Sequence, residues 1–215
     1  MTGRPAQADL NAYTAAILAG GKSTRMGRDK LTLDFGGAGM LASCAARFSA
    51  RFGRVVLSVA RAGDYPDIGL EHIADIHPGI GPIAGLHAVL AALAAEAGAE
   101  APTPAPKGVF LCAADMPYAS PQAAERICLL GEGYDACVPE DPEGRPEPLF
   151  AWYGLSLLPR AEEAIAKGRY KMAGLLKEAH VRIAAPTDLK GLWDAKSLTN
   201  INDPETYERE KNMLQ

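Results

Sequence analysis

Residues 16–30 combine glycines and cations in a pattern suited to binding phosphate groups. Their sequence is AILAGGKSTRMGRDK, and the apolar run 14–18 is predicted to be a strand that ends where the glycines begin. Glycine lets backbone N–H groups turn toward an anion without a side chain in the way. The stretch therefore predicts a polyphosphate loop after a strand, although a glycine turn followed by a solvated basic surface is the alternative from glycines and charges alone. The glycines are Gly20, Gly21 and Gly27, and the cations are Lys22, Arg25, Arg28 and Lys30.

The two best-known phosphate-loop motifs do not fit this stretch. A Walker loop ending at Gly21-Lys22-Ser23 would need a glycine five residues before Gly21, where the chain has Ala16. The dinucleotide fingerprint needs glycines at its first, third and sixth positions, which this loop does not supply. A different kind of nucleotide loop is therefore expected.

Two aspartates each follow a predicted strand. Asp115 comes directly after the apolar run 108–113, where a carboxylate can bind a Mg²⁺ ion that bridges nucleotide phosphates. A turn or N-cap aspartate before Pro117 is the alternative. Asp75 precedes the segment 76–85, in which Pro82 suits a helix start whose dipole favours anions.

The histidines near Asp75 are not expected to be catalytic. His77 and His87 are predicted to face solvent or to pack, because nothing nearby forms a nucleophile–base pair with either.

Alternating strand and helix patterns predict the elements that position these residues. Such alternation favours an α/β fold with three layers and a mostly parallel sheet. Because ligands bind at the carboxyl ends of parallel strands, the loops after Leu18, around Asp75 and after Ala113 should share one rim. The predicted strands are 14–18, 54–59, 71–74, 108–113, 135–139, 149–153 and 181–184, with an alternating piece at 31–35; the predicted helices are 40–52, 81–97, 121–130, 155–167, 172–179 and one starting at 203–204.

The chain has the length and composition of one sizeable domain. Of its 215 residues, 48% are hydrophobic and 22% are charged. We expect a flexible N-terminal arm at 1–13, a single domain over 14–215 and a Pro/Ala-rich surface linker at 98–107.

Composition also limits the partners and the compartment. The net charge of −4 argues against a nucleic-acid-binding surface. The four cysteines are scattered, with no metal-ligand spacing, and are expected to be buried thiols. No signal peptide and no membrane-spanning run is apparent, so a cytoplasmic protein without membrane contact is predicted.

The loop resembles the signature of the molybdenum cofactor guanylyltransferases, L-A-G-G-x-S-x-R-M-G-x-D-K, at every defined position from Leu18 to Lys30. Further stretches are similar to motifs of that family in the same order. The segment 75–85 resembles D…G-P-L-A-G, and 199–204 resembles N-I-N-T/D-P. The stretch 146–153 resembles the P-L-F-x-x-Y strand, which the resemblance implies to line the acceptor side. The resemblance covers about residues 15–207 and implies a Rossmann-like nucleotidyltransferase fold.

The resemblance also implies a reaction, in which GMP passes from GTP to molybdenum-bound molybdopterin and pyrophosphate leaves. Arg25 and Lys30 would hold phosphates, Asp115 would hold Mg²⁺ and contact the nucleotide, and Asn200 and Asn202 would bind the acceptor. The alternative for the last segment is that Asn202 or Asp203 caps the final helix. The other expected nucleotide contacts are Leu18, Ala19, Gly20, Gly21, Asp75 and Ser58; family members often carry asparagine where this chain has Ser58.

Three functions stay open at this point. The first is guanylyl transfer to the molybdenum cofactor, with molybdopterin-delivering proteins and recipient molybdoenzymes as expected partners. The second is a sister activity that uses CTP or a sugar-phosphate acceptor; the paired Gly20 and Gly21 favour guanine over it. The third is a nucleotide-binding partner without turnover, which the presence of Lys30 and Asp115 disfavours.

Overall fold

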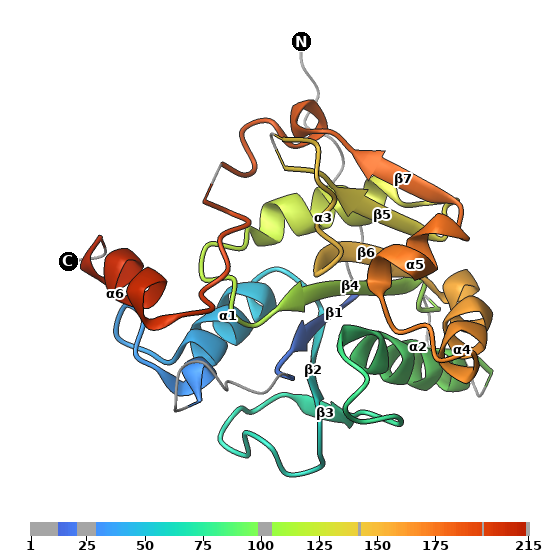
Figure 1. The fold of residues 1–215 in the computed structure, drawn as a ribbon, viewed down its shortest axis with the longest axis horizontal. Coiled ribbons are helices and arrows are strands. Elements are labelled where there is room, and N and C mark those ends of the chain that lie inside the picture. Colours follow the sequence, from blue (N-terminus) through green and yellow to red (C-terminus); the bar gives the residue numbers. More distant parts are fainter. Residues whose placement is uncertain (1–12, 21–28, 99–104, 142, 195, 214–215) are drawn as a thin grey trace.

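The predicted strands assemble into one seven-stranded sheet in a computed structural model (Figure 1), which describes residues 13–20, 29–98, 105–141, 143–194 and 196–213. The strand order is β3-β2-β1-β4-β6-β5-β7. The strands are β1 (Tyr13–Leu18), β2 (Arg54–Val59), β3 (Glu71–Ala74), β4 (Gly108–Ala113), β5 (Ala136–Pro139), β6 (Phe150–Gly154) and β7 (Val181–Ala184).

Helices cover both faces of the sheet, which confirms the predicted three-layer α/β fold. The central strands β1 and β4 are buried along their whole length, as expected of apolar runs covered on two sides. On one face pack α1 (Met40–Ser49) and α3 (Pro121–Leu130). On the other pack α2 (Pro82–Gly98), α4 (Leu158–Ala166) and α5 (Met172–Lys177), while α6 (Pro204–Asn212) lies at the edge of the molecule (Figure 1).

The sheet is mostly parallel, with one reversed strand. β1, β2, β3 and β4 run parallel to their neighbours, and so do β5 and β7, but β6 is antiparallel to both β4 and β5. The described residues of the link from Pro139 to Phe150 form no helix, and a parallel return needs a longer crossover than such a link provides. The chain therefore turns back on itself and enters the sheet in the opposite direction.

Several predicted boundaries differ from the observed ones. The alternating piece at 31–35 begins as a 3₁₀ turn, Lys30–Thr32, although Leu31, Leu33 and Phe35 are buried as their alternation suggests. The helix predicted at 155–167 is a 3₁₀ turn, Leu155–Leu157, followed by α4. The helices predicted to end at 52 and 179 end at Ser49 and Lys177. Short 3₁₀ turns also include Pro186–Leu189.

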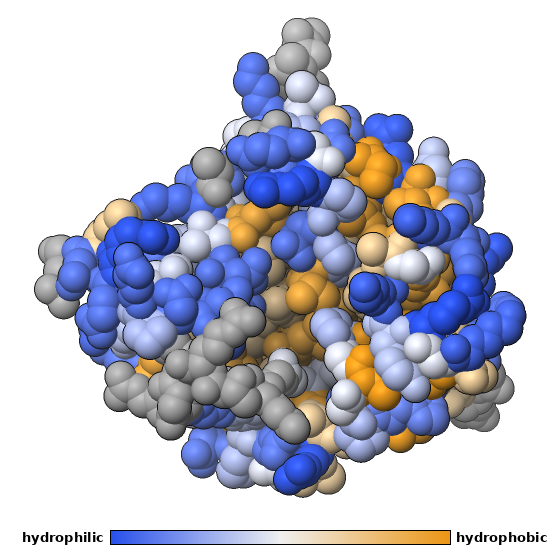
Figure 2. All heavy atoms as spheres, in the orientation of Figure 1, coloured by the Kyte–Doolittle hydropathy of each residue, from blue (hydrophilic) through white to orange (hydrophobic). Residues whose placement is uncertain are grey.

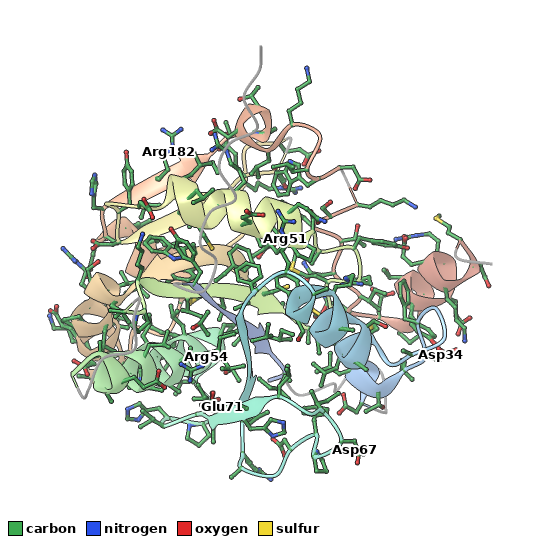
Figure 3. All side chains as sticks on the ribbon, turned by 180° about the vertical axis from the view of Figure 1, so that it is seen from behind. Asp34, Arg51, Arg54, Asp67, Glu71 and Arg182 are labelled. Atoms are coloured by element: carbon green, nitrogen blue, oxygen red, sulfur yellow. The ribbon has the colours of Figure 1, made fainter. Side chains whose placement is uncertain are left out.

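Charged side chains join the amino ends of the strands, far from the predicted rim. Arg54 begins β2, and its guanidinium lies 2.8 Å from the Glu71 carboxylate of β3 and 2.6 Å from the Glu96 carboxylate of α2. Figure 3 shows Arg54 and Glu71 close together at this end of the sheet. These contacts connect α2 to β2 and β3 at the end of the sheet opposite the rim.

The predicted arm at 1–13 lies almost wholly outside the described residues, as does most of the linker at 98–107, so the domain boundaries stay predictions. No helix in the described ranges is long and apolar enough to cross a membrane.

The antiparallel junction of β4 and β6 depends on glycine, and we predict that Gly108→Ala destabilises the fold. A Cβ at Gly108 would lie 2.2 Å from the Tyr153 carbonyl oxygen and 2.8 Å from the Gly154 Cα, both backbone atoms that cannot rotate away. We expect a loss of about 2 to 3 kcal/mol in the free energy of unfolding, measured by chemical denaturation. Gly69→Ala is the matched control, because nothing lies within 4 Å of its Cβ; equal losses in both variants would contradict the steric explanation.

Candidate active site

The carboxyl ends of four neighbouring parallel strands form one rim, as the sequence predicts. The strand register places Leu18 of β1 beside both Ser58 of β2 and Ala113 of β4, and Val59 beside Ala74. Figure 2 shows this side of the molecule hollowed near its centre, where Figure 1 shows β1 and β4, with apolar side chains at the bottom and polar ones around them. Loops from separate parts of the chain therefore face one hollow.

At this rim the Lys30 ammonium bonds to three oxygen atoms from two distant segments. Its Nζ atom donates to Asp115 Oδ2 at 2.5 Å, to Asn202 Oδ1 at 2.8 Å and to the Ile201 carbonyl oxygen at 3.0 Å. The Lys30 and Asp115 side chains are each 17% exposed, so the ion pair is only partly screened by water. The structure thus brings together three residues that the sequence nominated separately.

The strands and the 3₁₀ turn hold this lysine and aspartate in place. Lys30 begins the 3₁₀ turn, and Asp29 caps that turn by accepting a hydrogen bond from the Leu31 N–H at 3.0 Å. On the other side, the Ala114 N–H donates to the Leu18 carbonyl oxygen at 3.1 Å, which extends the β1–β4 pairing to the residue before Asp115. The pair is therefore attached to backbone that can move little.

A third segment, 199–203, closes the site from the C-terminal side. The Ile201 N–H donates to the Asp115 carbonyl oxygen at 3.0 Å, so the backbone of Ile201 contacts both partners of the ion pair. Its side chain is fully buried in a small apolar cluster with Leu33, Met40 and Tyr207. The sequence did not predict these backbone contacts of Ile201; it predicted roles only for the neighbouring asparagines.

The two asparagines have different surroundings. Asn202 is exposed and bonds to Lys30, whereas Asn200 is half-buried and its Nδ2 donates to the Leu198 carbonyl oxygen at 3.4 Å. The cap of α6 is Asp203, which accepts from the Thr206 N–H at 2.8 Å. The side chain of Asn202 thus faces Lys30 at the rim, and helix capping does not account for it.

Asp75, Ser58 and Leu18 meet at the start of α2. The Asp75 N–H donates to the Val59 carbonyl oxygen at 2.9 Å, and burial raises the pKa of the Asp75 carboxyl to about 6. A Cβ on Gly85 would lie 2.4 Å from Ser58 Oγ, 2.6 Å from Leu18 Cδ2 and 3.6 Å from Asp75 Oδ1. Glycine at position 85 therefore allows α2 to approach the strand ends closely.

The glycine loop itself is described only at its ends. Ala19 continues β1, since its N–H donates to the Ser58 carbonyl oxygen at 2.9 Å. Gly20 is exposed, and no described residue would lie within 4 Å of a Cβ placed on it. Gly21 and Arg25 lie outside the described residues. His77 is exposed and His87 is buried, in keeping with the expectation that they face solvent or pack.

Glu147 is a second residue that sequence reasoning did not single out. It lies within the 146–153 stretch, between two prolines, and its carboxyl is half-buried. Burial raises the pKa of Glu147, and the negative charges of Asp115 and Asp141 raise it further. An acidic residue inside a stretch that otherwise leads into a buried strand was the available signal.

A pocket of about 450 Å³ lies beside the rim but does not suit phosphates. It is bounded by the 3₁₀ turn, the start of α1 and the β2–β3 loop, and three carboxylates line it. These are Asp29, Asp64 and Asp67. Their negative charge repels anions, whereas the Lys30 ammonium lies at the rim itself.

The donor set at the rim fits a metal ion that arrives with a nucleotide. Among the described residues, no group of three or more His, Cys, Asp or Glu side chains could hold a metal by itself. Mg²⁺ keeps several waters and usually takes one or two protein carboxylates together with substrate phosphates. Asp115 meets that requirement. The nucleotidyltransferases that the sequence resembles generally depend on a divalent metal.

The chain is similar in sequence to named proteins from other organisms. The probable molybdenum cofactor guanylyltransferase of Pelotomaculum thermopropionicum is 29% identical over 192 residues, which cover 89% of this chain and 88% of that protein. The protein of the same name from Mycobacterium tuberculosis H37Rv is 31% identical over 90% of each chain.

Solved structures show the same architecture. Molybdopterin-guanine dinucleotide biosynthesis protein A from Archaeoglobus fulgidus superposes with a TM-score of 0.79 and 27% identity, covering 93% of this chain and 97% of that one. The 2-C-methyl-D-erythritol 4-phosphate cytidylyltransferase of Thermus thermophilus, at 16% identity and a TM-score of 0.62 over 92% and 96% of the chains, shares the fold. The family model described as the MobA-like NTP transferase domain matches residues 15–183, so the chain belongs to that nucleotidyltransferase family.

Proposed function

We propose that this protein transfers GMP from GTP to molybdenum-bound molybdopterin, giving the guanine dinucleotide cofactor and pyrophosphate. The observation that carries the proposal is the Lys30–Asp115 pair at the carboxyl ends of β1 and β4, reached by Asn202 from the C-terminal segment. A cation and a carboxylate at one point can serve a nucleotide phosphate and its metal ion together. The similarity to relatives named as guanylyltransferases supports the choice of substrates.

The chemistry proposed for the site needs charge stabilisation rather than a protein base. The attacking group is a phosphate oxygen of the acceptor, which is already anionic. The barrier comes from repulsion at the α-phosphorus and from charge that builds on the departing pyrophosphate. Lys30 would neutralise part of that charge, together with Arg25 from the glycine loop. Asp115 would hold Mg²⁺, which would supply further positive charge to offset the charge of the phosphates.

The nucleotide would occupy the β3-β2-β1 side of the rim. We assign the base and ribose of the nucleotide to the backbone at the end of β1 and just after it, which comprises Leu18, Ala19, Gly20 and Gly21. Asp75 and Ser58 would line the same half, because both meet the start of α2 at Gly85. The acceptor would then bind beyond Asp115, beside Asn200 and Asn202.

The assignment of guanine is tested by calorimetric titration of the pure protein with GTP and with CTP in the presence of Mg²⁺. We expect tighter binding of GTP, because Gly20 and Gly21 leave room for the larger base to approach the backbone. ATP and UTP complete the series. Equal affinities, or tighter CTP binding, would favour the sister cytidylyltransferase activity instead.

Asp115→Asn should abolish Mg²⁺-dependent transfer without unfolding the protein, because the change removes charge and keeps volume. The measurement is the rate of GMP transfer as a function of Mg²⁺ concentration, with a thermal melt to confirm folding. Asp67→Asn, on the β2–β3 loop, is the control and should keep the wild-type rate. Near-full turnover of the Asp115 variant at low Mg²⁺ would reduce Asp115 to a turn residue.

Lys30→Ala should lower the rate of transfer about 10² to 10³-fold, the usual effect of losing one preorganised electrostatic stabiliser. Arg25→Ala should have a similar or smaller effect, since neighbouring cations can partly replace it. Single-turnover kinetics with GTP and molybdenum-bound molybdopterin would measure the rate constants of both variants. Lys107→Ala, at the opposite end of β4, is the matched control: its ammonium pairs with Glu132 at 2.5 Å, away from the rim. A wild-type rate constant in the Lys30 variant would remove this residue from the chemistry.

A further inference from the structure

The segment that joins β5 to β6 holds Glu147 rigidly beside the candidate site. The Glu147 N–H donates to the Pro139 carbonyl oxygen at 2.9 Å, and the Glu147 carbonyl oxygen accepts from the Phe150 N–H at 3.2 Å. The Tyr153 hydroxyl also donates to the Pro148 carbonyl oxygen at 2.7 Å. The backbone is therefore hydrogen-bonded on both sides of Glu147, and the bond from the Leu149 N–H to Glu147 Oε1 at 2.9 Å orients the side chain.

The strand pairing places this segment next to Asp115, on the side away from the glycine loop. The Ala113 N–H donates to the Leu149 carbonyl oxygen at 2.9 Å, so residues 147–149 run past the end of β4. The sheet order puts β6 and β5 on one side of β4, and β1, β2 and β3 on the other. Glu147 therefore lies on the half of the rim that the proposed nucleotide contacts leave open.

The Glu147 carboxylate has acceptor capacity to spare. Its Oε1 accepts one hydrogen bond, from the Leu149 N–H at 2.9 Å. Glu147 takes part in none of the ion pairs found among the described residues, and burial together with the negative charges of Asp115 and Asp141 raises the pKa of its carboxyl. A carboxylate has about four lone-pair positions. A half-buried carboxylate of this kind gains strongly from neutral N–H donors, because they compensate its charge without a counter-ion.

The pterin part of the proposed acceptor offers such donors. A pterin carries a 2-amino group next to a ring N–H, and the two N–H bonds point the same way from one edge. A carboxylate accepts two such parallel bonds in the fork geometry that it also uses with guanidinium groups. We propose that Glu147 binds the amino edge of the pterin and so selects the acceptor. This inference rests on the proposed function and adds to it a residue that distinguishes pterins from related rings.

The test compares two ligands that differ at that edge. 6-Hydroxymethylpterin has the 2-amino group, whereas 6-hydroxymethyllumazine has an oxygen there. Fluorescence titrations would use the full chain saturated with Mg²⁺ and α,β-methylene GTP, so that the pterin cannot occupy the guanine position. Wild-type protein should bind the pterin about tenfold to a hundredfold more tightly than the lumazine.

Glu147→Gln should remove that preference and leave the affinity for the GTP analogue unchanged. The glutamine oxygen can still accept from the Leu149 N–H, so the segment should keep its conformation, which a thermal melt would check. Glu143→Gln is the matched control, because Glu143 lies in the same connecting segment but is exposed and pairs with Arg145. It should behave as wild type.

Three results would overturn the inference. A Glu147→Gln variant that keeps the wild-type preference would show that another group contacts the amino edge. A variant that loses Mg²⁺ affinity but keeps the preference would assign the carboxylate to the metal. If the wild-type protein transfers GMP to molybdopterin but binds pterin and lumazine equally, the role of Glu147 is rejected and the proposed function stands. If it neither transfers GMP nor binds the pterin, both the role of Glu147 and the proposed function are rejected.

Discussion

The ammonium of Lys30 is the point on which the candidate site depends. It joins the segment after the glycine loop to Asp115 at the end of β4 and to residues 201–202 near the C-terminus. An ammonium with this little exposure is stable only if oxygen atoms replace the water it has lost. Asp115, Asn202 and the Ile201 carbonyl group supply those atoms. Electrostatics thus requires three segments, distant in the sequence, to meet at one place.

Packing behind the rim makes that meeting reproducible. Ile201 is buried with Leu33, Met40 and Tyr207, and the Tyr207 hydroxyl donates to the Asp34 carbonyl oxygen at 2.6 Å. The helix α6 therefore attaches to the 30–40 segment independently of the ion pair. Since charged contacts alone set geometry poorly in water, this apolar cluster is what keeps the carbonyl group of Ile201 facing Lys30. The C-terminal segment is accordingly part of the site.

Local sequence patterns predicted where the strands lie, but they did not predict which distant segments contact one another. The runs 54–59, 71–74, 108–113 and 181–184 match the observed strands at both ends. For 54–59 and 108–113 the reason is that a short apolar or β-branched run bounded by polar residues leaves few alternatives. The three loops at one rim followed from the rule for parallel strands. The bond between Lys30 and Asn202 spans 172 residues and leaves no local pattern. The reversal of β6 likewise depends on the β5–β6 link, whose described residues form no helix. The position of Glu147 near Asp115 became clear only from the pairing of its segment with the end of β4.

The reversed strand also divides the rim chemically. On the β1 side, parallel strands end at the rim and continue into the glycine loop and into the start of α2. Gly85 allows α2 to lie close to the ends of β1 and β2. On the other side of β4, the antiparallel strand β6 begins at the rim instead of ending there. The residues just before β6, Glu147 among them, therefore lie at the rim. A parallel strand in this place would instead end at the rim, in a loop that leads to a helix. A reaction that joins two different molecules needs two different surfaces on either side of one charged centre. In the proposed reaction, the reversed strand next to Asp115 would provide these two surfaces within one sheet.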